Sequence, residues 1–113
     1  MTRAPSWSQY ERALRAGLHD VSVELREMRG AGGEYDPKRR RISLDAFNTA
    51  LLDGLIHELL HHVHYHRLAA FGAGEEPVTL TLEDEIVRWI NRSPQRQRWW
   101  RNALKAKLSE GAE

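Results

Sequence analysis

The feature that most constrains the fold is a long apolar stripe in the middle of the chain. Its large apolar side chains recur at spacings of three and four residues: Phe47, Leu51, Leu52, Leu55, Ile56, Leu59 and Val63. This spacing places them on one broad face of a helix. We expect this helix to be the central element, capped by Ser43 or Asp45 and running to about Ala70, before Gly72.

The length of the chain limits what can be built around such a helix. With 113 residues it can bury one modest core, so we predict a single domain over residues 1–113. It contains no cysteine, which excludes disulfides and thiolate metal sites. No apolar run approaches the roughly 18 residues that span a bilayer, and the N-terminus lacks the apolar region of a signal peptide. We therefore expect a cytoplasmic protein without membrane contact.

Before the central helix, the sequence predicts one helix and several short strands. The first helix covers Gln9 to Ala16, with Ser6 or Ser8 as its cap and Gly17 as its end. The alternation of apolar and polar residues over 21–25 predicts a half-buried strand. Residues 33–44, with Asp-Pro at their centre, predict a hairpin.

After the central helix, two further helices are expected. Residues 72–77 form a loop, and Thr79 or Thr81 then caps a helix with an apolar side formed by Ile86, Val87, Trp89 and Ile90. Beyond Pro94 a basic helix covers roughly residues 95–108 and packs on the same domain. The fold class is therefore α+β, with the strands near the N-terminus and helices after them.

The central helix carries the motif HExxH, as His57-Glu58-Leu59-Leu60-His61. Histidines four residues apart on a helix lie about one turn apart on nearly the same side, so both imidazoles can reach one tetrahedral zinc ion. Glu58 projects about 100° around the axis, close enough to meet a water on that ion. Zinc lowers the pKa of the water towards about 7, and Glu58 can accept its proton as general base.

A third protein ligand is needed, and the sequence offers several acids. His64 lies about 10 Å along the helix from His57, too far to share one ion. The metzincin class is excluded, because its extra glycine and histidine positions hold His64 and Arg67. Three consecutive acids on the next helix remain candidates: Glu83, Asp84 and Glu85. Helical phase favours Glu83, which falls within about 40° of the apolar side, while Asp84 and Glu85 suit a solvated helix start.

These segments resemble the minimal gluzincins, especially ImmA/IrrE-type metallopeptidase-like proteins and small phage-type HExxH proteins. The resemblance covers about residues 32–90: Gly33-Glu34-Tyr35-Asp36, Arg41-Ile42-Ser43-Leu44, the HExxH helix and the segment 83–89. It implies a zincin-like domain in which short strands lie beside the HExxH helix. It also implies a zinc metallopeptidase acting on a peptide or regulatory protein. Matching Trp89 to the family's aromatic places the glutamate ligand at Glu83, whereas Val87 and Ile90 depart from the pattern.

In such a peptidase the segment Arg41–Leu44 would be the edge strand along the cleft, where a substrate peptide adds by backbone pairing. Its basic approach, Lys38–Arg41, favours an acidic substrate segment, although charge on an edge strand also protects against aggregation. The oxyanion needs a donor besides zinc. The sequence does not choose among four candidates for that donor: Tyr65, His62, Tyr35 and Arg88.

The alternative function is nucleic-acid binding or another interaction through the C-terminal helices. There, aromatic residues interleave with cations, the composition that phosphate- and base-binding surfaces use: Trp89, Trp99 and Trp100 with Arg88, Arg92, Arg96, Arg98, Arg101, Lys105 and Lys107. The same residues also suit a core with a solvated basic face. In a third interpretation zinc only stabilises a small fold, and Glu58 argues against it because a structural site has no use for a general base.

Overall fold

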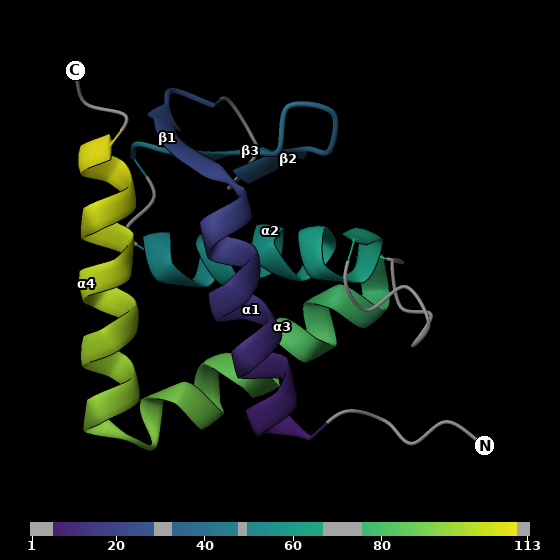
Figure 1. Ribbon diagram of the computed structural model, residues 1–113, viewed down its shortest axis with the longest axis vertical. Coiled ribbons are helices and arrows are strands. Elements are labelled where there is room, and N and C mark those ends of the chain that lie inside the picture. The colour runs from purple at the N-terminus through teal and green to yellow at the C-terminus, as the bar shows by residue number, and fades with distance from the viewer. Residues whose placement is uncertain (1–5, 29–32, 48–49, 67–75, 111–113) are drawn as a thin grey trace.

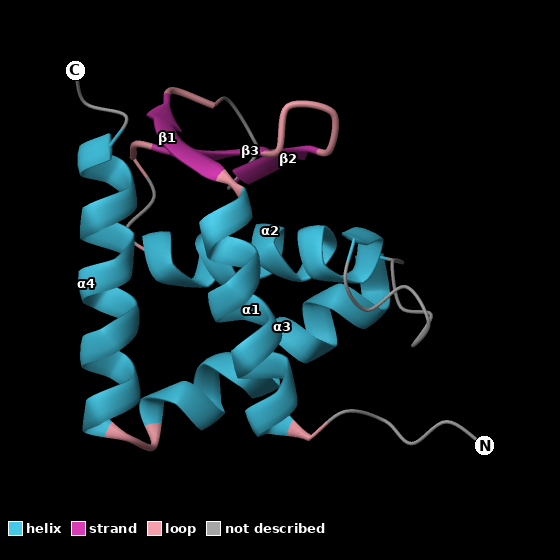
Figure 2. Ribbon diagram, in the orientation of Figure 1, coloured by secondary structure: helices cyan, strands magenta, loops and turns pink. Residues whose placement is uncertain are grey.

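The computed structural model describes residues 6–28, 33–47, 50–66 and 76–110, except for the side chains of 64–66 and 76–80. In this part of the chain, four helices surround one side and one end of a three-stranded sheet (Figures 1 and 2). Their bounds are α1 (Trp7–Asp20), β1 (Ser22–Arg26), β2 (Gly33–Asp36), β3 (Arg41–Asp45), α2 (Leu51–His66), α3 (Glu76–Asn91) and α4 (Pro94–Glu110). The predicted α+β class is confirmed. The finer expectation of a zincin-like domain does not follow from this arrangement.

The predicted Ser6 cap of α1 is confirmed, but the helix is longer than predicted at both ends. Ser6 caps it through a capping box, in which the Ser6 hydroxyl accepts from the Gln9 N–H at 3.2 Å and the Gln9 side chain accepts from the Ser6 N–H at 2.7 Å. The predicted end at Gly17 was wrong, because the helix continues to Asp20. Gly17 is buried, and a Cβ there would lie 2.8 Å from Val63 Cγ1. The glycine therefore lets α1 approach α2 closely and does not end the helix.

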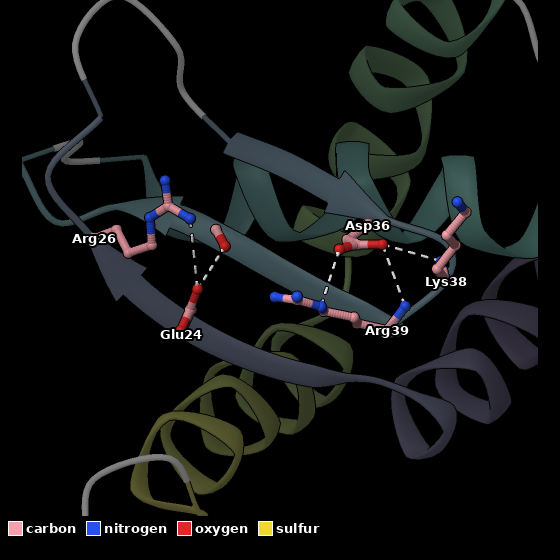
Figure 3. Close-up of polar contacts among 6 residues, drawn as sticks. Glu24, Arg26, Asp36, Lys38 and Arg39 are labelled. Atoms are coloured by element: carbon pink, nitrogen blue, oxygen red, sulfur yellow. Dashed lines mark hydrogen bonds and ion pairs between the residues drawn. The ribbon is translucent and has the colours of Figure 1, made fainter.

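The sheet has the order β1-β3-β2, with β1 parallel and β2 antiparallel to β3. The predicted hairpin is confirmed as β2 and β3, and the Asp36 carboxylate accepts from the Lys38 and Arg39 N–H groups in its turn (Figure 3). The prediction that Arg41–Leu44 forms an edge strand was wrong. This segment belongs to β3, the central strand, and the edges are β1 and β2.

Helix α2 crosses the centre of the molecule beneath the sheet (Figure 1). It begins at Leu51, so Phe47 is not part of the apolar stripe and is 75% exposed. The predicted caps Ser43 and Asp45 lie in β3. Asp45 instead accepts from the Phe47 N–H at 3.1 Å, which stabilises the turn after the strand. The predicted end at about Ala70 and most of the predicted loop lie outside the described residues.

The last two helices begin earlier than predicted. Helix α3 already includes Thr79 and Thr81, so neither residue caps it. Pro77 is in its first turn, where the missing N–H removes no intrahelical hydrogen bond. Helix α4 confirms the predicted C-terminal helix and starts at Pro94, with the Ser93 hydroxyl accepting from the Arg96 N–H at 3.3 Å.

The core lies where α2 meets the sheet and the other helices. Its fully buried side chains come from α1, β3, α2, α3 and α4, and the largest are Trp100, Leu14, Ile42, Leu44, Leu55, Ile56, Leu59, Leu60, Ile86 and Ile90. Burial also raises the pKa of the Tyr10 phenol above its usual value. Helix α2 contacts both β2 and α3 in this arrangement. Its polar residues therefore lie close to two different elements.

Candidate metal centre

The HExxH motif lies in the middle of α2, as predicted. The rings of His57 and His61 are half-buried, with centroids 5.0 Å apart and planes at 76°. Glu58 is 6% exposed. One donor atom from each of His57, Glu58 and His61 can be chosen so that all lie within 4.8 Å of one another. Helical spacing thus brings two imidazoles and one carboxylate close together on α2.

Strand β2 comes close to this cluster through Gly33. A Cβ at Gly33 would lie 3.2 Å from Glu58 Cγ and 3.3 Å from Glu58 Oε2, tighter than side chains ordinarily tolerate. The absence of a side chain at this position therefore leaves room for the Glu58 carboxylate between α2 and the sheet. The sequence placed Gly33 at the start of the predicted hairpin and within the family resemblance, but its contact with Glu58 was not predicted.

Among the three candidate acids of α3, Glu83 reaches the cluster. Its Oε2 atom lies 3.1 Å from His57 Nδ1, and the two side chains are 21% and 14% exposed. Asp84 is exposed and pairs with Arg88 at 3.1 Å, and Glu85 is exposed. The expectation that Asp84 and Glu85 lie at a helix start was wrong, because α3 begins at Glu76 and places them in its middle.

Next to the motif, His62 forms a buried polar network that links three elements. Its ring is fully buried, with Nδ1 2.6 Å from the Tyr35 hydroxyl of β2 and Nε2 3.3 Å from Asp20 Oδ2 of α1. A carboxylate accepts hydrogen bonds, so Nε2 is the donor to Asp20, and in the neutral ring Nδ1 accepts from the Tyr35 hydroxyl. Because Tyr35 and Gly33 share one face of β2, this network fixes the strand that lies against Glu58.

Among the candidate oxyanion donors, those with described side chains already have partners. Two of the four candidate oxyanion donors, Tyr35 and His62, bind each other, and Arg88 is exposed and paired with Asp84. The side chain of Tyr65 lies outside the described residues.

The aromatic residues of the C-terminal helices are engaged in packing. Trp100 is fully buried and donates to Glu11 at 3.2 Å. The Arg96 guanidinium lies 3.7 Å from the ring centroid of Trp89, and the Arg15 guanidinium lies 4.1 Å from that of Trp99. Each of the partly buried rings therefore has one face covered by a cation.

No protein-family model, curated protein or solved structure matches this chain. None of the described helices is long and apolar enough to cross a membrane.

The donor set agrees with what zinc binds in proteins. Imidazole nitrogens and carboxylate oxygens are its ligands where cysteine is absent, and the chain contains no cysteine. The imidazoles come from one turn of a buried helix and the Glu83 carboxylate from the helix packed beside it. Among the described residues, the donor atoms that could hold an ion come from His57, Glu58 and His61, and Glu83 lies outside this group but contacts His57 Nδ1.

Proposed function

We propose that this protein is a zinc-dependent hydrolase, with His57, His61 and Glu83 holding the ion and Glu58 as the general base. The observation that carries the proposal is the cluster of His57, Glu58 and His61 donor atoms within 4.8 Å, with a carboxylate from a second helix 3.1 Å from His57. A purely structural zinc site would explain the histidines and Glu83, but it assigns no role to the nearly buried Glu58.

Zinc in this site would supply Lewis acidity, which lowers the pKa of a bound water. Glu58 then accepts a proton at its carboxylate and delivers it to the leaving group. The position of Glu58 suits this role, since the residue is 6% exposed and Gly33, which has no side chain, leaves room for its carboxylate. A buried carboxylate has less conformational freedom than an exposed one, which favours proton transfer over a fixed distance.

Glu83 has two possible relations to the metal, and we propose the first. As a ligand, it completes coordination by two histidines and one carboxylate, the set that also follows from the resemblance to gluzincins. As a partner of His57 Nδ1, it would instead orient the ring, as carboxylates commonly do for metal-bound histidines. The 3.1 Å distance from His57 Nδ1 supports the second relation directly, and the first requires the Glu83 carboxylate to join the group formed by His57, Glu58 and His61.

The proposed substrate is a peptide or a protein segment, and the proposed domain type is a minimal zincin-like one. Strand β2 is an edge of the sheet and carries Gly33 directly against Glu58. An extended peptide that paired with the outer edge of β2 would therefore lie along α2 beside the cluster. The proposed position of the substrate is therefore the edge strand β2, whereas the sequence had suggested the segment that forms β3.

The test compares Glu58→Gln with the native chain and with Glu85→Gln, an exposed acid on α3 as the matched control. Each zinc-loaded protein is incubated with a library of unstructured peptides, and cleavage is followed by mass spectrometry. We expect Glu58→Gln to keep its zinc and to lose hydrolysis by about 10²–10⁴-fold, because the amide cannot accept a proton. Glu85→Gln should cleave at the native rate.

Cleavage by Glu58→Gln at the native rate would show that this carboxylate is not the base. A native chain that binds zinc tightly but cleaves no peptide in the library would support the structural role of the metal instead.

A further inference from the structure

Helix α4 and the N-terminal end of α2 border a groove of about 570 Å³. Figure 1 shows α4 passing that end of α2 along one side of the molecule. The volume falls within the range of sites that bind small ligands or a few side chains of a partner, about 300–1,000 Å³. None of the residues assigned above to the metal centre lines the groove.

The lining of the groove divides into an apolar part and a cationic part. Leu51 of α2 and Leu104 and Leu108 of α4 are half-buried and pack on the core, so they form its floor. Arg98, Arg101 and Lys105 are exposed and form its rim. The two groups occupy neighbouring stripes of α4, because residues spaced by three and four lie on one side of a helix.

The charge of the groove is of one sign. No acidic residue lines it, and within the described chain none of the three rim cations forms an ion pair with a carboxylate. By contrast, Arg88 of α3 pairs with Asp84, and Lys107 of α4 pairs with Glu110. The rim cations are therefore available to carboxylates from another molecule.

We propose that this groove binds an acidic, amphipathic segment of a partner protein. Apolar side chains of the segment contact Leu51, Leu104 and Leu108, and its carboxylates pair with Arg98, Arg101 and Lys105. Such a segment carries apolar residues at spacings of three and four with acids beside them, the pattern of a helix that binds in a groove.

A nucleic acid fits this groove less well. Base stacking uses aromatic rings, and none of the described residues that line the groove is aromatic, while Trp89 and Trp99 each have a face covered by an arginine. A phosphate backbone carries no apolar group that would contact the leucines of the floor. An acidic peptide uses both the floor and the rim.

This inference does not depend on the metal centre. Leu51 precedes His57 by six residues, which is about 9 Å along α2. A partner bound in the groove therefore lies beside the end of α2 that precedes the motif. The two sites can be tested separately, since variants of the rim leave the histidines intact.

The probe is a short fluorescein-labelled peptide of glutamate and leucine, with leucines at spacings of three and four. Its binding to the full-length chain is measured by fluorescence anisotropy at low salt, using Glu58→Gln as the background so that the peptide stays intact. We expect Arg98→Glu combined with Arg101→Glu to weaken binding by about tenfold or more. Leu108→Ser should also weaken it. The matched charge reversal at exposed positions outside the groove, Arg12→Glu with Arg92→Glu, should change it by less than about twofold.

Two further peptides require no protein variant. Replacing the glutamates by lysines should abolish binding, and replacing the leucines by serines should weaken it about as strongly as Leu108→Ser does. The proposal is overturned if the lysine peptide binds as well as the glutamate peptide, or if the Arg98 and Arg101 reversals have no effect. It is also overturned if a single-stranded oligonucleotide of the same charge displaces the peptide and binds more tightly, since the surface would then be a phosphate-binding one.

Discussion

Helices α2 and α4 both carry many polar residues, but polar residues at the motif of α2 are buried, whereas the cations beside the groove on α4 are exposed. On α2, Glu58 is 6% exposed, and His62 is fully buried between Tyr35 and Asp20. On α4, the cations Arg98, Arg101 and Lys105 are exposed beside a groove. The polar groups of α2 are held by other elements of the fold, whereas these cations of α4 face the solvent.

This difference indicates what each region can do. A buried polar group must be hydrogen-bonded, so its position is tied to the positions of its partners. Such groups suit chemistry, which requires atoms within a few tenths of an ångström. Exposed cations contribute to association through charge and tolerate several geometries, which suits docking of a partner. We therefore expect single substitutions to have large effects at the α2 cluster and small effects on the rim of the groove.

Among the non-histidine residues, the largest effect on zinc affinity is expected at Glu83, with Glu85 as its neighbour on the same helix. Glu83→Gln should weaken zinc affinity by at least about 10–100-fold, because even a carboxylate that only orients a metal-bound histidine has an effect of this size. Glu85→Gln should leave the affinity unchanged, since Glu85 is exposed. The affinities are measured by competition with a chromogenic chelator.

A zinc-bound crystal structure then separates the two roles of Glu83. A ligand oxygen would lie about 2.0–2.2 Å from the metal. An oxygen of Glu85 at that distance, with Glu83 remote, would reverse the assignment. If Glu83→Gln and Glu85→Gln have equal zinc affinity, the contrast between buried and exposed polar residues fails at this site.

A smaller effect is expected from Tyr35→Phe, which removes the hydroxyl that contacts His62 Nδ1 at 2.6 Å. The free energy of unfolding should fall by about 1–3 kcal/mol, because a fully buried ring nitrogen loses a hydrogen-bond partner. The control Arg98→Ala changes an exposed cation and should alter stability by at most about 0.5 kcal/mol. Urea denaturation followed by circular dichroism measures both values. Equal stabilities of the two variants would contradict the difference drawn between α2 and α4.

Local patterns in the sequence predicted much of the fold. The apolar period identified α2, Asp-Pro identified the turn of the hairpin, and the C-terminal helix was placed within two residues at each end. The errors came from residues whose role depends on distant contacts. Gly17 suggested a helix end, but it lies inside α1. Its missing side chain allows the close packing of α2, a contact that the local sequence does not reveal. Whether β2 or β3 is the edge depends on the pairing of β1, which no local pattern reveals.

For the candidate site, too, local patterns could be predicted from the sequence, whereas contacts between distant residues could not. Helical spacing on one element predicted that His57, Glu58 and His61 converge, and helical phase on the next favoured Glu83 over Glu85. The contacts of His62 with Tyr35 and Asp20 span 27 and 42 residues of sequence, so no spacing rule could identify them. Gly33 carries no side chain, and its contact with Glu58 became evident only when the strand was placed beside α2.

The central claim, a zinc site at His57 and His61, is tested most directly by metal analysis. The native chain, His57→Ala, His61→Ala and the control His19→Ala, which changes an exposed histidine of α1, are purified from zinc-replete medium and analysed by mass spectrometry. The account predicts about one zinc per chain for the native protein and His19→Ala, and almost none for the other two. No zinc in the native protein, or a full complement in both His57→Ala and His61→Ala, would contradict it.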